Sequence, residues 1–284
     1  MAAIREIRHH VRAVHSLRQM THALTQVASA RARKCRIQLR EVAPYARGLE
    51  RAMSLLTLRH GLQHPLLWRR PVQRDVAVVV GSERGFCGTH NLEVVRVVTA
   101  LQGPEPGVQR DFLAVGSKLA EVMKTHGIVP ATMMTRPRWG YPAEIAPLAD
   151  DLTAGYLNGG YQRVIIVGFA REDSGRKAVT IRVLLPAHPA SEPALSRLSP
   201  EIEPGSTELM DHVIPRLIRS QLRMAILHSM VFEEEARALA MQSATANADD
   251  LLVELMRRYR RARQDRITRE LLEVVATTDA GAAA

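Results

Sequence analysis

The stretch that decides the fold is residues 251–275, LLVELMRRYRRARQDRITRELLEVV, near the end of the chain. Its apolar residues recur at roughly helical spacing and arginines crowd the opposite face, as in an amphipathic helix. No proline or glycine interrupts the chain from Arg216 to Ala280, so we expect one helix from Ser206 to about Thr277. At a rise of about 1.5 Å per residue, this helix would approach roughly 100 Å, far more than the width of a compact domain. It therefore needs a second long element to pack against.

The first segment of the chain can supply that element. Its apolar residues are spaced alternately by three and four, which is typical of a coiled-coil seam. The expected seam residues are Ile4, Ile7, Val11, Val14, Leu17, Met20 or Thr21, Leu24 and Val27. Small residues dominate both 28–35 and 236–248, so the two helices can approach closely there as an antiparallel pair. Pro44 should kink or open the first helix around residues 40–43.

Between these helices, short β-branched runs alternate with helical patterns. The expected strands are 75–81, 111–115, 163–168 and 178–185, and the expected helices are 92–101, 117–126 and 142–157. Such alternation predicts an α/β fold with a Rossmann-like central layer, whose last strands can run antiparallel. A proline-rich linker follows at 186–205. We therefore expect an N-terminal coiled-coil helix (1–60), a central α/β domain with its linker (61–205) and a C-terminal coiled-coil helix (206–284).

Composition and charge limit the kinds of partner. The 284 residues are 46% hydrophobic but only 4% aromatic, which favours helical packing by aliphatic side chains. The net charge of +10 is uneven, because residues 1–57 hold 11 Lys and Arg against 3 Asp and Glu. This segment should face an acidic partner such as nucleic acid, an anionic membrane or an acidic protein surface. No apolar run is long enough to predict a membrane-spanning helix.

The loop Gly81–Gly88 follows an expected strand and precedes an expected helix, where phosphate-binding loops occur. It matches neither GxGxxG nor GxxxxGK[ST], so a structural turn is the favoured interpretation. Cys87 and His90 could be drawn as nucleophile and base, but no orienting carboxylate accompanies them. His9, His10, His15 and His22 lack consistent facing as metal ligands. We expect no catalytic residues, metal or cofactor.

The arginine-rich face of residues 257–269 leaves three interpretations open. It could be a solvated helix face, a protein-docking face or a phosphate-binding face. The i,i+4 pairs Glu254–Arg258 and Asp265–Arg269 would partly neutralise it. A basic helical nucleic-acid-binding protein is therefore an alternative function, and a small α/β nucleotide-using enzyme is a less favoured one. Nucleic acid ranks below protein docking, because the stacking aromatic residues of single-strand binders are absent.

Taken together, the two ends of the chain resemble the gamma subunit of F-type ATP synthases. The matching segments are 4–8 (IREIR), 20–24 (MTHAL), 27–34 (VASARARK), 44–46 (PYA), 64–66 (HPL), 82–91 (SERGFCGTHN), 235–241 (EARALAM), 244–248 (ATANA) and 262–275 (ARQDRITRELLEVV). The resemblance covers essentially the whole chain and is most specific at its ends.

The resemblance implies a rotor shaft without a catalytic site of its own. Its terminal helices would form an antiparallel coiled coil inside a ring of alpha and beta subunits, with the α/β domain below, against epsilon and the membrane c-ring. Such a protein is peripheral, on the cytoplasmic face of the bacterial inner membrane, and binds no nucleic acid. The implied beta-subunit contact and coupling residues are Arg263, Gln264, Thr268, Glu270 and Arg237, with Leu24, Arg31 and Arg33 on the first helix.

Several positions depart from the family pattern. Leu24 replaces a usual methionine, His22 a usual lysine, and Thr89-His90 a usual Gly-Leu. Gln242 stands where lysine is common, and Pro215 lies within the expected last helix. These changes indicate a divergent bacterial member, such as a subunit of an alternative F-type ATPase.

Overall fold

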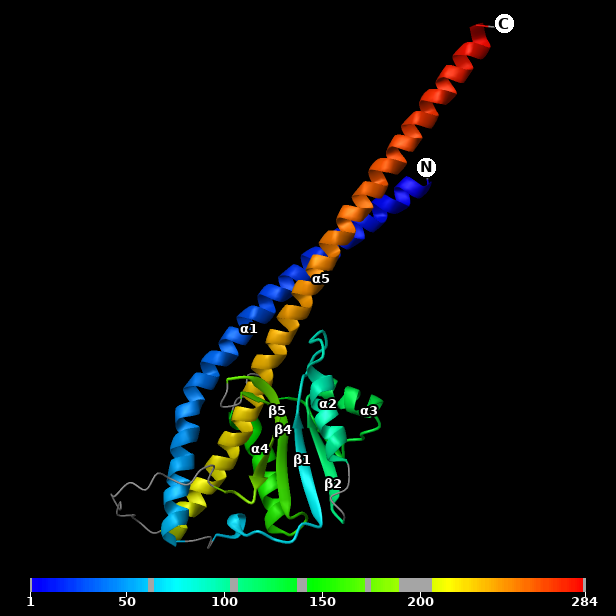
Figure 1. The fold of residues 1–284 in the computed structure, drawn as a ribbon. Helices are drawn as coiled ribbons and strands as arrows, with labels where there is room; N and C mark the ends of the chain where they lie inside the picture. The colour runs from blue at the N-terminus through cyan, green and yellow to red at the C-terminus, as the bar shows by residue number, and fades with distance from the viewer. Residues whose placement is uncertain are drawn as a thin grey trace. The chain divides into compact units, whose positions relative to one another are not determined.

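The computed structural model describes residues 2–60, 64–102, 107–136, 142–171, 175–188 and 206–282. Figure 1 shows two long terminal helices and a central sheet flanked by shorter helices. In chain order the elements are α1 (Ala2–His60), the 3-10 helix η1 (Pro65–Leu67), β1 (Arg74–Val80), α2 (His90–Leu101), β2 (Gln109–Val115), α3 (Ser117–Thr125), β3 (Thr132–Met134), α4 (Pro142–Leu157), β4 (Arg163–Arg171), β5 (Lys177–Leu185) and α5 (Ser206–Ala282). The predicted α/β class, with a long helix at each end, is confirmed.

The sheet has five strands in the order β3-β2-β1-β4-β5. Strands β1 to β4 pair in parallel, and β5 runs antiparallel to β4, an arrangement that the sequence pattern allowed for the last strands. Two short elements were not predicted, the 3-10 helix η1 and the edge strand β3. Each has only three residues, too few to show a periodic pattern.

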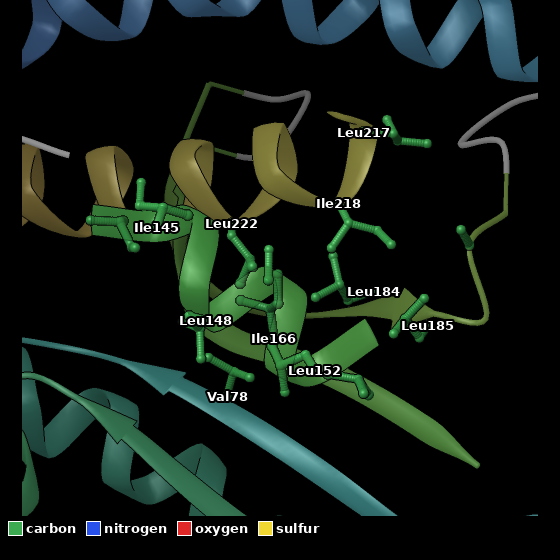
Figure 2. Close-up of a cluster of buried hydrophobic side chains, with 14 of the residues drawn as sticks. Val78, Ile145, Leu148, Leu152, Ile166, Leu184, Leu185, Leu217, Ile218 and Leu222 are labelled. Carbon is green, nitrogen blue, oxygen red and sulfur yellow. The ribbon is translucent and has the colours of Figure 1, made fainter. Parts of the chain in front are cut away.

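Side chains on the two faces of the sheet pack against different helices. On one face, Val76, Val78 and Val80 join α4 and the first half of α5 in a large apolar cluster. Figure 2 shows part of this cluster, in which Leu148 and Leu152 of α4 lie near Val78 and Ile166. On the other face, Ala77 and Val79 pack with α2 and α3. Because β1 is buried on both faces, its β-branched run was readable as a strand.

Packing divides the chain into two units. Unit 1 comprises Met1–Ala28 with Ala238–Ala284, and unit 2 comprises Ser29–Arg237. Both boundaries fall inside the long helices α1 and α5. The sequence-based division at residues 60 and 205 stays a prediction.

In unit 1, the two helices form an antiparallel pair. Residue contacts run in opposite directions along them: the Arg8 Nη2 group donates to the Tyr259 hydroxyl at 3.1 Å, Arg18 pairs with Asp249, and the Thr245 hydroxyl donates to that of Thr21 at 2.8 Å. Ala28 and Ala248 are both buried, as expected for the small-residue zone. The predicted pairing of the chain start with the chain end is therefore confirmed within this unit.

The predicted seam of α1 is correct as far as Val14 and again at Thr21, and wrong at Leu17, Leu24 and Val27. Leu17, Met20, Leu24 and Val27 are exposed by 37–61%. The buried and half-buried positions are instead Arg18, Thr21, Thr25 and Ala28, which continue the alternating spacing from Val14 by four, three, four and three. The sequence analysis placed Leu17 in the seam because it is hydrophobic, whereas the heptad spacing places residue 18 there.

Neither proline breaks its helix. Helix α1 continues through Pro44, with Val42 and Ala46 buried on either side, so the expected opening around residues 40–43 does not occur. Helix α5 begins at Ser206, so Pro215 does not displace its start. Both helices therefore continue through their proline although each proline removes one backbone hydrogen bond.

His90 is a buried polar residue at the start of α2. Its side chain is 1% exposed and stacks on Phe169 with ring centroids 4.5 Å apart, and neither ring nitrogen has a hydrogen-bond partner among the residues that the structure describes. Burial, reinforced by the positive charges of Lys177, Arg136 and Arg237, lowers the pKa of His90 to about 3. The ring is therefore neutral in the folded protein across the neutral pH range.

This residue makes the folded state sensitive to acid. The unfolded chain takes up a proton on His90 below its ordinary pKa of about 6.5, whereas the folded chain does not until about pH 3, so stability falls as pH falls between these values. At pH 4 the loss from this one group is about 3 kcal/mol. His90→Leu should remove that loss and raise stability at pH 7 by about 1 kcal/mol or more. Urea unfolding at pH 7 and pH 4 measures the stability at pH 7 and its loss in acid. The control is His22→Leu at an exposed position, which should change neither quantity. Equal acid sensitivity of wild type and His90→Leu would contradict this account.

Candidate functional surface

The C-terminal end of α5 lies beyond the helix pair of unit 1. Arg8 lies opposite Tyr259 in the antiparallel pair, so Ala2, the first described residue of α1, is opposite about residue 265. Helix α5 continues to Ala282, so its last part is a single helix, as Figure 1 shows past the N-terminus. A single helix of this length is only marginally stable in water without a packing partner.

Four of the predicted contact residues lie at this single-helix end or directly before it. Arg263, Gln264, Thr268 and Glu270 all have exposed side chains. The carboxylate of Glu270 lies 3.2 Å from Nε of Arg266. Large apolar side chains are exposed among them: Ile267 by 42%, Leu271 by 61% and Leu272 by 63%. This combination of polar groups and uncovered apolar groups is typical of a protein-contact surface.

Helix α1 carries a second uncovered apolar surface in the same unit. Leu17, Met20, Leu24 and Val27 follow one another at spacings of three, four and three, so they share one side of the helix. We call these four residues the α1 stripe. The α1 stripe includes Leu24, one of the predicted contact residues, and it lies next to the buried seam rather than within it.

The arginine-rich face of α5 is exposed except for the half-buried Arg266. Arg258 pairs with Glu254, as predicted. The predicted Asp265–Arg269 pair is absent from the described part of the chain, and the pair one position later, Arg266–Glu270, is formed instead. Such exposed pairs contribute little stability, so most of these guanidinium groups remain available to a partner.

Arg237 occupies a different environment from the other predicted contact residues. It lies in unit 2, is 7% exposed, and binds the carboxylates of Glu233 at 2.5 Å and Glu234 at 2.8 Å. Burial disfavours its charge, but the two carboxylates outweigh burial and raise the pKa of the guanidinium. Arg136 binds Glu233 from the other side. Arg237 is therefore part of a buried ion-pair network.

This network holds the Gly81–Gly88 loop. Arg237 donates to the backbone carbonyls of Arg84 at 3.3 Å and Gly85 at 3.2 Å. The Asn91 side chain both accepts from the Ser82 backbone N–H at 3.0 Å and donates to the Ser82 hydroxyl at 2.7 Å. The loop is thus a structural turn anchored to α5, as the sequence analysis favoured.

The remaining predicted contact residues are on α1 in unit 2. Arg31 is half-buried, with Nη1 3.8 Å from the carboxylate of Glu234, and so lies at the edge of the ion-pair network. Arg33 is exposed. The structure therefore brings Arg31 and Arg237 to one network, and groups Arg263, Gln264, Thr268 and Glu270 at the end of α5.

Comparison with known proteins decides the family. A family model described as ATP synthase matches residues 3–281. The ATP synthase gamma chain of Trichlorobacter lovleyi is 31% identical over 285 residues, which cover 97% of each chain. That of Flavobacterium johnsoniae is 30% identical over 284 residues, which cover 99% of each chain. The chain belongs to the ATP synthase gamma-chain family.

Solved structures show the same fold at lower sequence identity. A chain in the Euglena gracilis mitochondrial ATP synthase (OSCP/F1/c-ring, rotational state 3) has a TM-score of 0.67 at 17% identity, covering 98% of this chain and 94% of that one. A chain in the Tetrahymena thermophila mitochondrial ATP synthase (central stalk/c-ring) has a TM-score of 0.58 at 18% identity, covering 79% of this chain and 99% of that one. Family membership makes this gamma-type chain a rotor subunit of the central stalk, without a catalytic site of its own.

The geometry of the loop agrees with a non-catalytic subunit. The Cys87 thiol is buried and contacts the Ser82 hydroxyl at 3.6 Å and the Arg84 carbonyl at 3.7 Å, while neither His90 ring nitrogen has a partner in the described part of the chain. Because the pKa of His90 is about 3, it is a poor base at neutral pH. The gamma-chain relatives support the rotor function and not the enzyme or nucleic-acid alternative. Over the residues that the structure describes, no helix is apolar for long enough to cross a membrane.

Sequence reasoning missed two parts of this arrangement. Phe86 is 76% exposed and has a φ of 60°, which is unusual for a residue other than glycine, so the loop presents an apolar ring to solvent. Glu233, at the centre of the ion-pair network, is 1% exposed. A run of three glutamates at 233–235 beside apolar residues was a signal for a buried acidic group, but its partners lie far away in the sequence.

Proposed function

We propose that this gamma-type chain turns inside a ring of alpha and beta subunits, with unit 1 as the part that the ring surrounds. The observation that carries this placement is the end of α5, which extends past the part of the helix that pairs with α1. Ile267, Leu271 and Leu272 are exposed there. A surrounding protein would cover these side chains and stabilise the single helix. The α1 stripe gives the same unit a second apolar contact surface.

The mechanism follows from an asymmetric shaft in a ring of similar sites. The apolar α1 stripe and the arginine-rich face of α5 differ in polarity and charge, so each orientation of the shaft offers a catalytic subunit different contacts. A contact that favours one conformation of that subunit over another shifts its equilibrium by the difference in contact free energy. Rotation would in this way couple the state of each site to the shaft angle.

Charge supports an acidic partner for the first helix. Residues 1–57 carry 11 basic against 3 acidic groups, and most of those basic side chains are exposed. Acidic segments of beta subunits are the partner that the family resemblance implies. Long-range attraction would guide assembly more than it would strengthen the final complex.

We propose the remaining partners from the family. The α/β sheet region would contact epsilon and the membrane c-ring, which would make the chain a peripheral protein on the cytoplasmic face of the bacterial inner membrane. Copurification of the chain with alpha, beta and epsilon subunits in a fixed ratio tests this assembly. Recovery of the chain alone, from cells that contain the other subunits in complex, would contradict it.

The double substitution Arg263→Ala with Gln264→Ala should impair ATP-driven rotation. Both side chains are exposed at the end of α5, so their removal should leave the fold and the free energy of unfolding within about 0.5 kcal/mol of wild type. The expected result is a reduction of torque-generating ATP hydrolysis by about tenfold, as for the loss of about 1.4 kcal/mol of contact energy. The measurement is single-molecule rotation together with bulk ATP hydrolysis of the assembled complex.

The matched control is Arg216→Ala, which also removes an exposed arginine from α5 but in unit 2. Its rotation rate should equal that of wild type. Rotation and ATP hydrolysis at the wild-type rate in the Arg263→Ala, Gln264→Ala complex would show that these two residues are not part of the contact surface.

A further inference from the structure

A cavity of about 250 Å³ lies within unit 2, away from the surfaces described above. It is bordered by three elements: α1 near residues 43–50, the strand pair β4 and β5, and α5 at residues 221–228. It is partly open, and its arginine side chains are exposed to solvent. Small residues such as Ala46, Gly168 and Ala225 line parts of its wall and leave the space open. This volume admits a small ion with several polar atoms but not a whole nucleotide.

The lining is strongly basic. Arg47 of α1, Arg171 of β4 and Arg182 of β5 border the cavity, against the single carboxylate of Glu50. Arg171 Nη1 donates to the Gly175 carbonyl at 2.7 Å, so this side chain is held in place. Within the part of the chain that the structure describes, no hydrogen bond or ion pair occupies the guanidinium groups of Arg47 and Arg182. Arg47 and Arg182, from different elements, therefore border one space, and among the described residues the Glu50 carboxylate forms no ion pair with either.

Neutral donors complete the lining. The Thr180 hydroxyl lies at the cavity wall and is 3.4 Å from the Gly168 carbonyl. His228 of α5 also lines the cavity, and burial followed by the charges of Arg182 and Arg171 lowers its pKa to about 4. The positive charges of Arg182 and Arg171 thus disfavour protonation of the His228 ring. The neutral ring can still donate one hydrogen bond.

We propose that this cavity binds a small oxyanion of the phosphate class, with Arg47 and Arg182 as its principal ligands. Guanidinium groups bind phosphate oxygens through paired, charge-assisted hydrogen bonds, which suits arginine over lysine at both positions. A bound anion would connect α1 to β5 and α5 across the cavity, and so would stiffen the region where the long helices meet the sheet. Inorganic phosphate, pyrophosphate and the phosphate end of ADP share this chemistry, and the cavity volume favours the first two.

Isothermal titration of the purified full-length chain tests the proposal. Inorganic phosphate, pyrophosphate and ADP are titrated separately at constant ionic strength in chloride, together with thermal unfolding in each anion. Saturable one-to-one binding of phosphate or pyrophosphate, with a raised Tm, is the expected result. Arg182→Ala and Arg47→Ala should each weaken binding by about tenfold or more, because each removes a charged hydrogen-bond donor.

The matched control is Arg96→Ala on α2, which removes the same charge from an exposed position outside the cavity. It should leave the affinity unchanged, whereas Arg182→Lys, which keeps a charge but not the paired donors, should bind with intermediate affinity. Equal weakening by Arg96→Ala and Arg182→Ala would show general electrostatic attraction and overturn the site. Absence of saturable binding by the folded wild type at millimolar phosphate and pyrophosphate would also overturn it. The placement of unit 1 in a ring rests on other residues, so either result leaves that placement unaffected.

Discussion

Replacing Glu233 by alanine is expected to lower the free energy of unfolding of unit 2 by about 3 to 5 kcal/mol. The carboxylate is buried between Arg136 and Arg237, whose side chains are themselves only 9% and 8% exposed. Its removal leaves Arg136 buried without its carboxylate and Arg237 with Glu234 alone. A loss of this size is a large fraction of the stability of an ordinary domain. Urea unfolding followed by circular dichroism measures it.

The neighbouring Glu235 provides the control. It pairs with Arg36 at 2.6 Å, but both side chains are substantially exposed, so Glu235→Ala should cost less than about 1 kcal/mol. Because the network also holds the carbonyls of Arg84 and Gly85, Glu233→Ala should loosen the Gly81–Gly88 loop and speed amide exchange there. Similar effects of the two substitutions would show that burial of the network contributes no stability.

Asp75→Ala should destabilise the sheet by a comparable amount, about 3 to 5 kcal/mol. Asp75 is fully buried and joins three strands, because Arg110 of β2 binds it at 2.7 and 2.8 Å and Arg163 of β4 binds it at 2.7 and 3.0 Å. Burial alone would raise the pKa of Asp75, but the two guanidinium groups lower it below its usual value. The pairing therefore stabilises the fold above the ordinary carboxyl pKa of about 3.9, and this stability is lost as pH falls below it.

The control for Asp75 lies at the same end of the sheet. Asp111 of β2 pairs with Arg74 of β1 at 2.6 Å, but these side chains are 24% and 49% exposed. Asp111→Ala should therefore shift the urea midpoint only slightly, whereas Asp75→Ala should shift it strongly and reduce the acid sensitivity of unfolding. An Asp75→Ala protein as stable as Asp111→Ala would mean that hydration of the arginines replaces the buried pair at no cost.

Patterns that act over short distances in the sequence were the most predictable. The β-branched run of β1 and the helical spacing of α5 each predicted the correct type of element. A strand that is buried on both faces is a continuous apolar run, and a helix that is buried on one side repeats its apolar residues at helical spacing. Leu17 was wrongly assigned to the seam because it is more hydrophobic than Arg18, although heptad geometry selects position 18. Hydrophobicity alone could not show that the four residues of the α1 stripe face outward.

Interactions between distant segments were not predictable in the same way. Asp75 lies 35 residues from Arg110 and 88 from Arg163, and nothing near any of the three marks them as partners. The same is true of Arg136 and Glu233, 97 residues apart. Family resemblance supplied the proposed contact residues at the end of α5, but not the buried environment of Arg237, which depends on the folded loop.

The buried environment changes the expected role of Arg237. Its guanidinium is committed to Glu233, Glu234 and two loop carbonyls, so an effect on coupling would reach a partner through the loop it holds. Phe86 is exposed on that loop, and we propose it as the side chain that would make such a contact. Arg263 and Gln264, by contrast, have exposed side chains, so the contact we propose for them would be direct.

Rotation of the shaft itself is the most direct test of the proposed function. Both native cysteines are buried, so a single exposed cysteine from Lys124→Cys on α3 can carry a bead selectively on the assembled complex. With the ring of alpha and beta subunits fixed to a surface and ATP supplied, the bead should rotate in one direction and stop when ATP is removed. ATP hydrolysis at the normal rate by complexes whose bead only fluctuates would contradict a rotor function.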